Sequence, residues 1–254
     1  MSKLVDKLHY LSRLSPQMGF HPGAAGSAPP SMLLIAGLRG KDAAEARALA
    51  EGNIDAGLLL EQTDAAQIKQ IAKAMGSLPL GVFLRGESSP QAAEIADSGG
   101  DFIVFDTRTP IKTLEAKGLG KLLAVEPSLE SSLIGGISEL EVDGVLIVNK
   151  QPVITIEHLL FCRRVIASTA KPLLMAVASP LTKEDINSLW EAGIEGVVTP
   201  PGQLPRQLSP LREMIAALPQ RRKRRRGETG VALPHYVRQL TDEPEEEEEE
   251  EEEI

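Results

Sequence analysis

The segment KPLLMAVASPLTKEDINSLWEAGIEGVVTPPG, residues 171–202, places a polar, helix-like stretch between two apolar runs of strand length, PLLMAVAS (172–179) and IEGVVTP (194–200). Thr182 is a suitable N-cap for the helix, and Ile186 and Trp190 share one of its faces. Gly193 follows, where a left-handed residue would end the helix. The segment therefore predicts a strand, a helix and a second strand, with the single tryptophan packed against the sheet.

The same unit recurs through most of the chain. Six further apolar runs precede this segment, at 31–38, 56–62, 79–86, 101–107, 121–127 and 144–150, and the starts of all eight are 20 to 28 residues apart. That spacing suits one strand, one helix and two short loops. Nearly continuous apolar strands are typical of a parallel sheet that is covered on both faces.

Eight such units in about 170 residues favour a compact α/β fold, a closed (β/α)8 TIM barrel. An open doubly wound sheet is the alternative, but the first helix-opening loop, GLRGKDAA, lacks the G-x-G-x-x-G fingerprint of the dinucleotide-binding version. Ser89-Pro90 and Thr109-Pro110 predict helix starts after the strands at 79–86 and 101–107. Glycines are expected to end five of the helices, at positions 52, 76, 99, 118 and 193.

Two appendages flank the predicted barrel, which spans residues 31–218. Residues 1–30 hold an amphipathic helix, with Leu4, Leu8 and Leu11 on one face, and a linker rich in Pro, Gly and Ala. Because the linker leads to the beginning of the first strand, we expect the helix to plug the bottom of the barrel. A dimer contact is the alternative.

Residues 219–254 form a highly charged tail, which we expect to be disordered. It contains RRKRRR (221–226) and eleven acidic residues within 242–253, among them nine consecutive glutamates. The net charge of -9 comes from this run, since its removal leaves 25 acidic residues against 27 Lys and Arg. Six adjacent cations suit a nucleic-acid backbone, yet the glutamates compete for them, so nucleic-acid binding is not expected.

Other features of the sequence indicate where in the cell the protein is expected. The one cysteine, Cys162, cannot form an internal disulfide and lies in the apolar helix EHLLFCRRVI, where it reads as a packed small residue. The first residues carry Lys3, Asp6 and Lys7 where a signal peptide would be apolar, and no apolar run approaches the ~18 residues of a membrane span. We therefore expect a cytoplasmic protein with no membrane segment.

Candidate catalytic residues stand at the carboxyl ends of the predicted strands, where TIM barrels hold their active sites. Five consecutive strands end near Glu61, Arg85, Asp106, Glu126 and Lys150, and barrel closure is expected to bring several of these side chains together. Lys150 is then a Schiff-base or general-base amine, with carboxylates from Glu61, Glu126 and Asp106 nearby to move protons. Arg85 is expected to hold a substrate carboxylate or phosphate. The alternative for Lys150, which we favour for a lysine followed by Gln151 and Pro152, is a structural ion pair at the rim.

The segment 171–202 resembles the phosphate-binding, aldolase-type TIM barrels. That resemblance implies anion binding by the loops after the last two strands, with Ser179, Thr182, Thr199 and Gly202 as the candidate residues. The loops depart from the pattern, because they read Ala178-Ser179-Pro180 and Thr199-Pro200-Pro201-Gly202. Prolines remove amide donors that would bind phosphate.

Within that group the chain resembles the class I aldolases that cleave keto-deoxy sugar-acid phosphates. Glu61 and Lys150 match the family's glutamate on the second strand and its Schiff-base lysine on the sixth. The family's arginine four residues after the glutamate is missing, since Ala65 stands there.

No cofactor is predicted. The four histidines are scattered and there is no C-x-x-C, so a metal site built on His or Cys is not expected. Mg²⁺ bound by carboxylates 61, 106 and 126, and a bound flavin (FMN), stay open.

The first functional hypothesis is an enzyme, a lyase or isomerase acting on a small anionic, possibly phosphorylated, carbonyl compound. The second is a catalytically degenerate barrel that works as a binding or scaffold protein. A third is partner or nucleic-acid binding through RRKRRR. The sequence leaves the oligomeric state open.

Overall fold

The computed structural model describes residues 2–13, 30–40, 42–85 and 89–219. The predicted disordered tail, with its RRKRRR and glutamate runs, and most of the predicted linker lie outside these residues. The statements below concern the described part.

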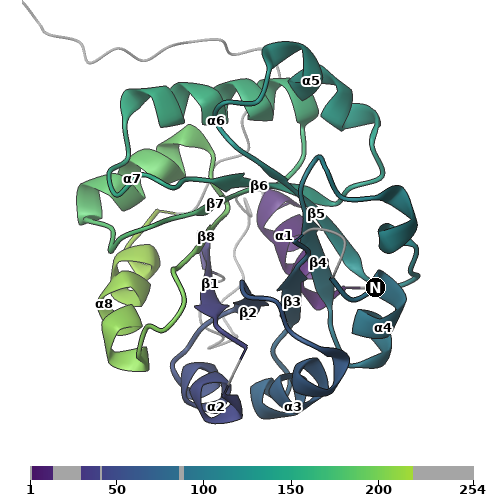
Figure 1. Ribbon diagram of the computed structural model, residues 1–254. Coiled ribbons are helices and arrows are strands. Elements are labelled where there is room, and N and C mark those ends of the chain that lie inside the picture. Colours follow the sequence, from purple (N-terminus) through teal and green to yellow (C-terminus); the bar gives the residue numbers. More distant parts are fainter. Residues whose placement is uncertain (1, 14–29, 41, 86–88, 220–254) are drawn as a thin grey trace, which may run out of the picture. The chain divides into compact units, whose positions relative to one another are not determined.

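Eight parallel strands close into a barrel in the order in which they occur along the chain, and β1 pairs with both β2 and β8 (Figure 1). The predicted (β/α)8 TIM barrel is therefore confirmed, and the open sheet is excluded. The strands are β1 (Leu33–Leu38), β2 (Ala56–Leu59), β3 (Leu80–Phe83), β4 (Phe102–Phe105), β5 (Gly120–Val125), β6 (Gly144–Val148), β7 (Leu173–Ala176) and β8 (Gly196–Val198).

Helices surround the strands, one or more after each of them (Figure 1). They are α2 (Ala43–Glu51), α3 (Ala65–Met75), α4 (Ala92–Asp97), the 3₁₀ turn η1 (Ile111–Leu114), α5 (Ser131–Gly136) with η2 (Ile137–Glu139), α6 (Ile156–Thr169), α7 (Lys183–Ala192) and α8 (Pro205–Ala216). The longest of these described helices, α6, has 14 residues, and none of them meets the length and hydropathy that a membrane span requires.

Some of the helices begin and end at the residues that the sequence predicts, and others do not. Thr182 caps α7 by accepting a hydrogen bond from the Asp185 N–H, and Gly193 ends that helix at φ 105°, as predicted. The left-handed residue after α2 is Asn53, at φ 62°, whereas the predicted Gly52 has φ −82°. Trp190 is partly buried and packs against the apolar layer between helices and sheet.

Two predicted N-caps, Ser89 and Thr109, are wrong, although a helix begins within three residues of each. Ser89 does not cap α4, which begins at Ala92, because the Ser89 hydroxyl bonds to the backbone N–H and carbonyl of Arg85. After β4 there is only η1, since the Thr109 hydroxyl donates to Asp106 Oδ1 at 3.1 Å and closes a turn there. In both places the hydroxyl bonds to residues behind it and not to the next helix.

Alternate residues along the strands form two apolar layers. One layer fills the barrel and includes Phe102 and Val104 of β4, Leu122 and Ala124 of β5, and Leu146 of β6. The other lies between the strands and the surrounding helices. Gly81 of β3 leaves the space that the Phe102 ring occupies inside the barrel, where a Cβ would collide with the ring.

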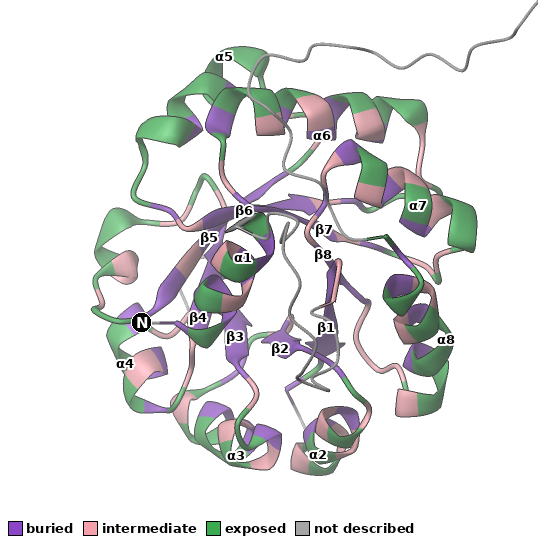
Figure 2. Ribbon diagram, turned by 180° about the vertical axis from the view of Figure 1, so that it is seen from behind, coloured by how far each residue is buried: buried purple, intermediate pink, exposed green. Residues whose placement is uncertain are grey.

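Helix α1 (Lys3–Arg13) plugs the barrel at the amino ends of the strands. Its Leu4, Leu8 and Leu11 belong to the same apolar cluster as the barrel interior. Viewed from behind, α1 lies in front of the strands, within their ring (Figure 2). The predicted plug is therefore confirmed.

An acidic residue stands directly before each even-numbered strand, a periodicity that the sequence analysis did not recognise. These residues are Asp55, Asp101, Asp143 and Glu195. Each donates its backbone N–H to a carbonyl of the preceding strand, at 2.7–2.8 Å. Asp143 also accepts from the Lys121 N–H at 2.8 Å, so it binds that backbone position with both its main chain and its side chain.

Three members of this acidic set hold α1. Asp101 accepts hydrogen bonds from the backbone N–H groups of Lys3 and Leu4 at 2.8 and 3.0 Å and so caps the start of the helix. Lys7 donates to the Asp55 backbone carbonyl at 2.8 Å, and Ser12 donates to Glu195 at 3.0 Å.

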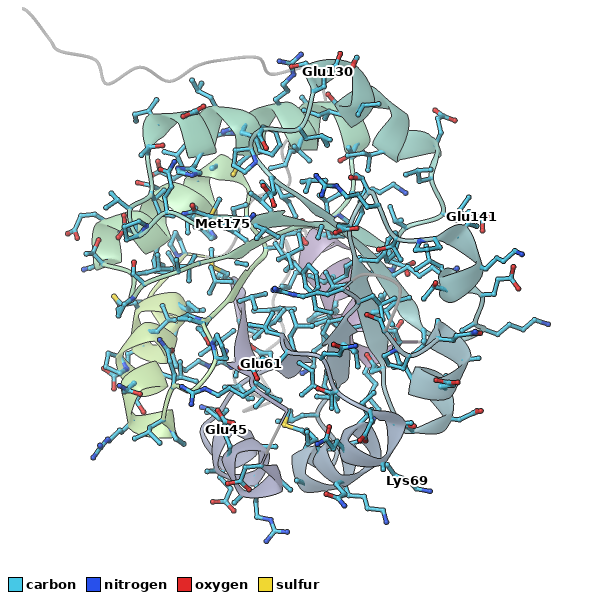
Figure 3. All side chains as sticks on the ribbon, in the orientation of Figure 1. Glu45, Glu61, Lys69, Glu130, Glu141 and Met175 are labelled. Carbon is cyan, nitrogen blue, oxygen red and sulfur yellow. The ribbon has the colours of Figure 1, made fainter. Side chains whose placement is uncertain are left out.

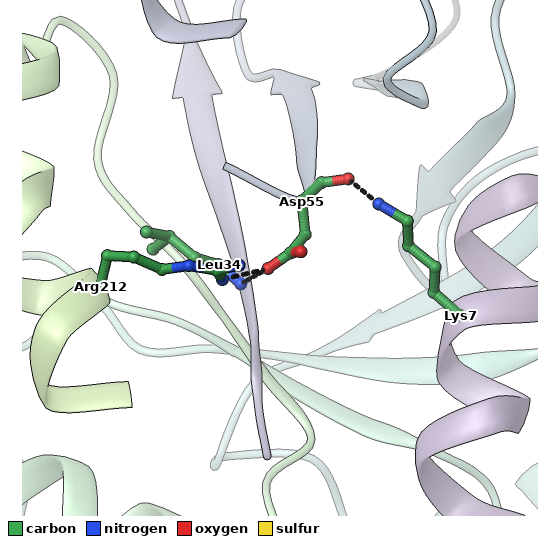
Figure 4. Close-up of polar contacts among 4 residues, drawn as sticks. All are labelled: Lys7, Leu34, Asp55 and Arg212. Atoms are coloured by element: carbon green, nitrogen blue, oxygen red, sulfur yellow. Dashed lines mark hydrogen bonds and ion pairs between the residues drawn. The ribbon is translucent and has the colours of Figure 1, made fainter. Parts of the chain in front are cut away.

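Asp55 also links two more elements of the fold, α8 and β1 (Figure 4). Its Oδ2 accepts from Arg212 of α8 at 2.6 Å and from the backbone N–H of Leu34 in β1 at 2.9 Å. Both charged side chains are largely buried, at 21% exposure for Arg212 and 11% for Asp55. This end of the barrel is thus held by partly buried polar contacts and serves stability.

Candidate functional site

A pocket opens at the carboxyl ends of β5 and β6, the end of the barrel opposite α1. Its volume is about 260 Å³, and its walls come from the segments that follow the two strands and from the start of α6. It is lined by Glu126, Pro127, Ser128, Val148, Asn149, Lys150, Gln151, Glu157 and His158. All of these residues lie on the face where TIM barrels carry their active sites.

Glu126 and Lys150 meet in this pocket. Lys150 Nζ lies 2.7 Å from Glu126 Oε1, and the side chains are 71% and 51% exposed. Leu122 and Ala124 on β5, and Leu146 on β6, face the barrel interior, so the two-residue alternation of a strand carries Glu126 and Lys150 to the inner rim. An ion pair this exposed contributes only about 0–1 kcal/mol to stability. The pair therefore places an acid beside an amine and does little to hold the fold.

Asn149 is the buried polar residue of the pocket, with 5% exposure. Its Oδ1 accepts from the Gln151 N–H at 2.8 Å, which leaves the amide nitrogen as the free group. Nδ2 is buried and has no hydrogen-bond partner among the described residues. A buried donor without an acceptor costs about 1–3 kcal/mol. Asn149 is thus a buried residue in the wall of the pocket whose amide nitrogen is unsatisfied.

His158, 3% exposed, lies in the first turn of α6. Its Nδ1 accepts from the Thr155 backbone N–H at 3.0 Å, and the Thr155 hydroxyl lies 2.7 Å from the same atom. Because a backbone N–H can only donate, this contact fits the tautomer that carries its hydrogen on Nε2. His158 therefore caps the helix with one nitrogen and has an N–H donor on the other.

The other predicted catalytic residues do not join this pair. Glu61, partly buried, follows β2, and β2 lies opposite β6 in an eight-stranded ring. Figure 3 shows Glu61 on the side of the ring near α2. Asp106 accepts from the Arg108 N–H at 2.9 Å and from Thr109, and the Arg85 guanidinium lies 4.9 Å from the centre of the Phe83 ring. The expected convergence of five strand ends is thus limited to Glu126 and Lys150.

The predicted anion-binding residues have intramolecular partners. The Thr182 hydroxyl and N–H both donate to Asp185, at 2.8 and 2.9 Å, and Ser179 donates to the Pro152 carbonyl. Thr199 is 2% exposed and accepts from the Gly37 N–H at 3.4 Å. The Arg39 guanidinium packs directly on Gly202. Anion binding by these four residues stays a prediction.

Carboxylates 61, 106 and 126 do not form a metal site. Across the described ranges, no group of three or more His, Cys, Asp or Glu side chains is arranged to hold a metal ion. This is consistent with the ring geometry, because β2 and β5 are three strands apart.

Two buried polar residues of the pocket, Asn149 and His158, were not among the predicted site residues. Thr155 and His158 have the spacing of a capping box, with histidine in the place usually taken by glutamate or glutamine. That spacing would have marked His158 as a residue at the start of a helix after β6. The orphaned amide of Asn149 has no counterpart in the sequence pattern, because it depends on what surrounds the side chain.

No protein-family model and no curated protein sequence matches the chain. Solved structures match its fold. A mutant alpha-subunit of tryptophan synthase from Pyrococcus furiosus is 14% identical, with 66% of this chain and 86% of that one covered and a TM-score of 0.53. The homocysteine methyltransferase of Escherichia coli is 11% identical, with coverages of 72% and 95% and a TM-score of 0.55.

A variant of the citrate synthase SbnG is also similar, at 11% identity, coverages of 66% and 86% and a TM-score of 0.51. At these identities the likeness concerns the fold alone, and function is argued from the site. The chain has the TIM-barrel fold of all three proteins.

Proposed function

We propose that this chain is an enzyme, a lyase or isomerase that acts on a small anionic carbonyl compound in the pocket at the ends of β5 and β6. The observation that carries the proposal is the contact of Lys150 Nζ with Glu126 Oε1, at 2.7 Å, in the wall of that pocket. An acid and an amine within hydrogen-bond reach, on the catalytic face of a TIM barrel, are the minimum set for carbonyl chemistry.

The lyase form uses Lys150 as nucleophile. Glu126 accepts a proton from the ammonium group, and the neutral amine adds to the substrate carbonyl carbon. The carbinolamine loses its oxygen as water to give a protonated imine. The bond between the α and β carbons then breaks: the β-hydroxyl passes its proton to Glu126 and leaves as an aldehyde, and the electron pair of the bond forms an enamine. Glu126 returns the proton to the α carbon, and water hydrolyses the imine to release the second product and Lys150.

The isomerase form uses the same pair without a covalent bond. A basic group at this position removes a proton from the carbon next to the carbonyl and returns it at the neighbouring carbon. Both forms need Lys150 and Glu126, and only the lyase form attaches the substrate to the protein.

The test is reductive trapping. Incubation with pyruvate and borohydride, followed by peptide mass spectrometry, should add the mass of the reduced adduct to Lys150. Lys150→Arg should abolish the adduct, because arginine keeps the charge and cannot form the imine. The matched control is Lys171→Arg, since Lys171 is a lysine outside the pocket that donates to the carbonyls of Leu140 and Val142.

Absence of label on Lys150 across a panel of 2-oxo acids, or equal labelling of many lysines, would rule out the lyase form. The isomerase form then predicts exchange of carbon-bound hydrogen for deuterium next to the carbonyl, followed by NMR. This exchange should be lost in both Lys150→Met and Glu126→Gln, and its persistence in either variant would reject that form.

The second candidate is a catalytically degenerate barrel that works as a binding protein. It is favoured by the loop after β7, where the hydroxyls of Ser179 and Thr182 donate to groups of the chain itself. This candidate predicts saturable binding of a small molecule at the β5–β6 pocket, with neither the adduct nor the exchange. Binding that persists in Lys150→Met, in the absence of both reactions, would support it.

A further inference from the structure

We infer that the outward face of α6, with the adjoining residues of α5 and η2, is an interface at which two copies of this chain pair with their α6 helices antiparallel. The inference goes beyond the proposed function and does not depend on it. It rests on exposed apolar side chains that gather on one side of the barrel, and on charges that match when this face meets the same face of a second copy.

Large apolar side chains are exposed along the segment from α5 to α6. Eight such side chains are exposed among the described residues, and five of them, each 49–71% exposed, are Leu133, Leu140, Val153, Ile156 and Leu160. These five lie on neighbouring elements, since α5 and η2 both pack against α6, and Figures 1 and 2 show α5 and α6 side by side. Exposed apolar side chains that gather in one patch mark an interaction site.

Helix α6 is apolar on two opposite sides. Phe161 and Val165 are buried in the layer between the helices and the strands. Ile156 and Leu160 lie one turn apart on the other side, and both are largely exposed. A helix that is apolar all round is normally buried. The neighbouring helices α5 and α7 pack against α6 and leave this side open within the described part of the chain, so the face fits a cover from another molecule.

The charges on this face match those of a second copy. Glu157 and Arg164 are both exposed, and they stand three and four residues on either side of Leu160. Because seven residues make nearly two turns, both lie on the same edge of the apolar face.

When a second α6 lies antiparallel across Leu160, Glu157 of each copy faces Arg164 of the other. The two contacts form together, as a two-fold symmetric interface requires. Parallel α6 helices would instead bring Glu157 against Glu157 and Arg164 against Arg164. The occupant that these charges fit is therefore a second copy of this chain in the antiparallel orientation.

The interface also reaches the candidate functional site. Glu157 lines the pocket at the ends of β5 and β6 and stands at the edge of the apolar face. A dimer of this kind brings Arg164 of the second copy to that residue. Each pocket of the dimer then has a positive charge of the other copy at its wall.

The oligomeric state of the full chain is the first test. Sedimentation velocity over about 1–200 µM covers the dissociation constants expected of a small interface. The fraction of dimer should rise with concentration in this range. Lys150→Met should dimerise like the native chain, which keeps this test separate from that of the proposed function. A native chain that stays monomeric at the highest concentration overturns the inference.

Leu160→Glu tests the centre of the face. The two-fold axis places this residue close to its own copy, so two like charges meet within an apolar contact and the dissociation constant should rise at least about tenfold. The matched control is Ile111→Glu in η1, because Ile111 is 82% exposed and lies outside the proposed interface. Circular dichroism reports whether both variants fold. A native dimer that Leu160→Glu leaves intact uses another face, and the inference is then wrong.

Charge reversal tests the antiparallel arrangement. Glu157→Arg and Arg164→Glu should each weaken self-association at least about threefold, because each variant makes both contacts repulsive. An equimolar mixture should recover pairing, since one copy then carries two arginines and the other two glutamates. Native mass spectrometry separates this heterodimer from the homodimers when one variant is isotopically labelled. If the mixture pairs no better than either variant alone, the antiparallel interface is rejected.

Discussion

Cys162 lies in the middle of α6 and has no exposed surface. Burial raises the pKa of its thiol to about 12, and its own backbone hydrogen bond and Arg163 only partly oppose this shift. The thiolate is the reactive form of cysteine. The interpretation of Cys162 as a packed apolar residue is therefore supported, and the thiol is chemically inert in the folded protein.

We predict that a disulfide reagent at pH 8 modifies Cys162 much more slowly in the native protein than in denaturant. Because the folded pKa is the higher one, the thiol's contribution to stability is present below pH 9 and declines between pH 9 and about 12. Labelling rates followed by absorbance provide the measurement. Equal rates for folded and unfolded protein would show that the site opens readily.

The ion pair of Arg212 with Asp55 differs from that of Lys150 with Glu126 in its burial. Arg212→Met removes one partner of a largely buried pair and leaves the Asp55 carboxylate with the Leu34 N–H. We expect a loss of about 1–3 kcal/mol in the free energy of unfolding in urea. Arg206→Met on the exposed face of the same helix is the control and should have little effect. Similar losses in both variants would contradict the assigned role of the pair.

Of the candidate residues, the pairing of Lys150 with Glu126 was predictable from the sequence. Adjacent parallel strands end side by side, and two-residue alternation carries both side chains to the same rim. The role of Asn149 was not predictable in the same way. Whether its amide nitrogen finds an acceptor depends on the start of α6, which a strand pattern does not describe.

At the scale of elements, helix α1 is not one of the eight strand–helix units, yet it packs into the barrel. Leu8 of α1 is fully buried against the barrel interior. We expect Leu8→Ala to reduce the free energy of unfolding by about 2–5 kcal/mol, the usual cost of a cavity at a fully buried leucine. Chemical denaturation with two spectroscopic probes provides the measurement.

Tyr10→Ala on the same helix is the matched control. Tyr10 is 56% exposed, so its loss should change stability far less. If Leu8→Ala behaves like the control, α1 detaches at little cost and is not part of the core.

The strands were predictable at this scale, and the caps of two helices were not. All eight strands were recognised because burial on both faces makes each of them a continuous apolar run. Ser-Pro and Thr-Pro indicated helix starts at Ser89 and Thr109, but each hydroxyl found its partner behind it, at Arg85 or Asp106. The sequence identifies residues that are able to cap a helix. It does not show to which backbone group their hydroxyl will bond.

At the scale of the molecule, the closed ring explains why five polar strand ends do not make one site. Residues on neighbouring strands, such as Glu126 and Lys150, can touch at the rim, whereas β2 and β6 lie on opposite sides. The order of the strands was predicted. Which of the side chains at the strand ends touch one another across the mouth of the barrel was not. The pair of Glu126 with Lys150 is therefore one between adjacent strands.

The distribution of charge along the chain leads to a prediction of its own. RRKRRR at 221–226 and the acidic run at 242–253 lie outside the described residues and are opposite in charge. Deletion of residues 242–254 should strengthen binding of duplex DNA at low salt, because the glutamates no longer compete for the cations. Fluorescence anisotropy over a salt series measures the effect. Unchanged affinity and salt dependence would remove the nucleic-acid interpretation of RRKRRR.

Helix α1 also has a mechanical consequence. Its first turn is bound to Asp101 before β4, and Ser12 near its end is bound to Glu195 before β8. β4 and β8 face each other across the ring, and 11 residues of helix span roughly 16 Å. A helix that is bound at both ends across the barrel resists compression of the barrel along its own axis. It restrains the perpendicular direction less. The barrel should therefore be stiffer along the axis from β4 to β8 than along the axis from β2 to β6.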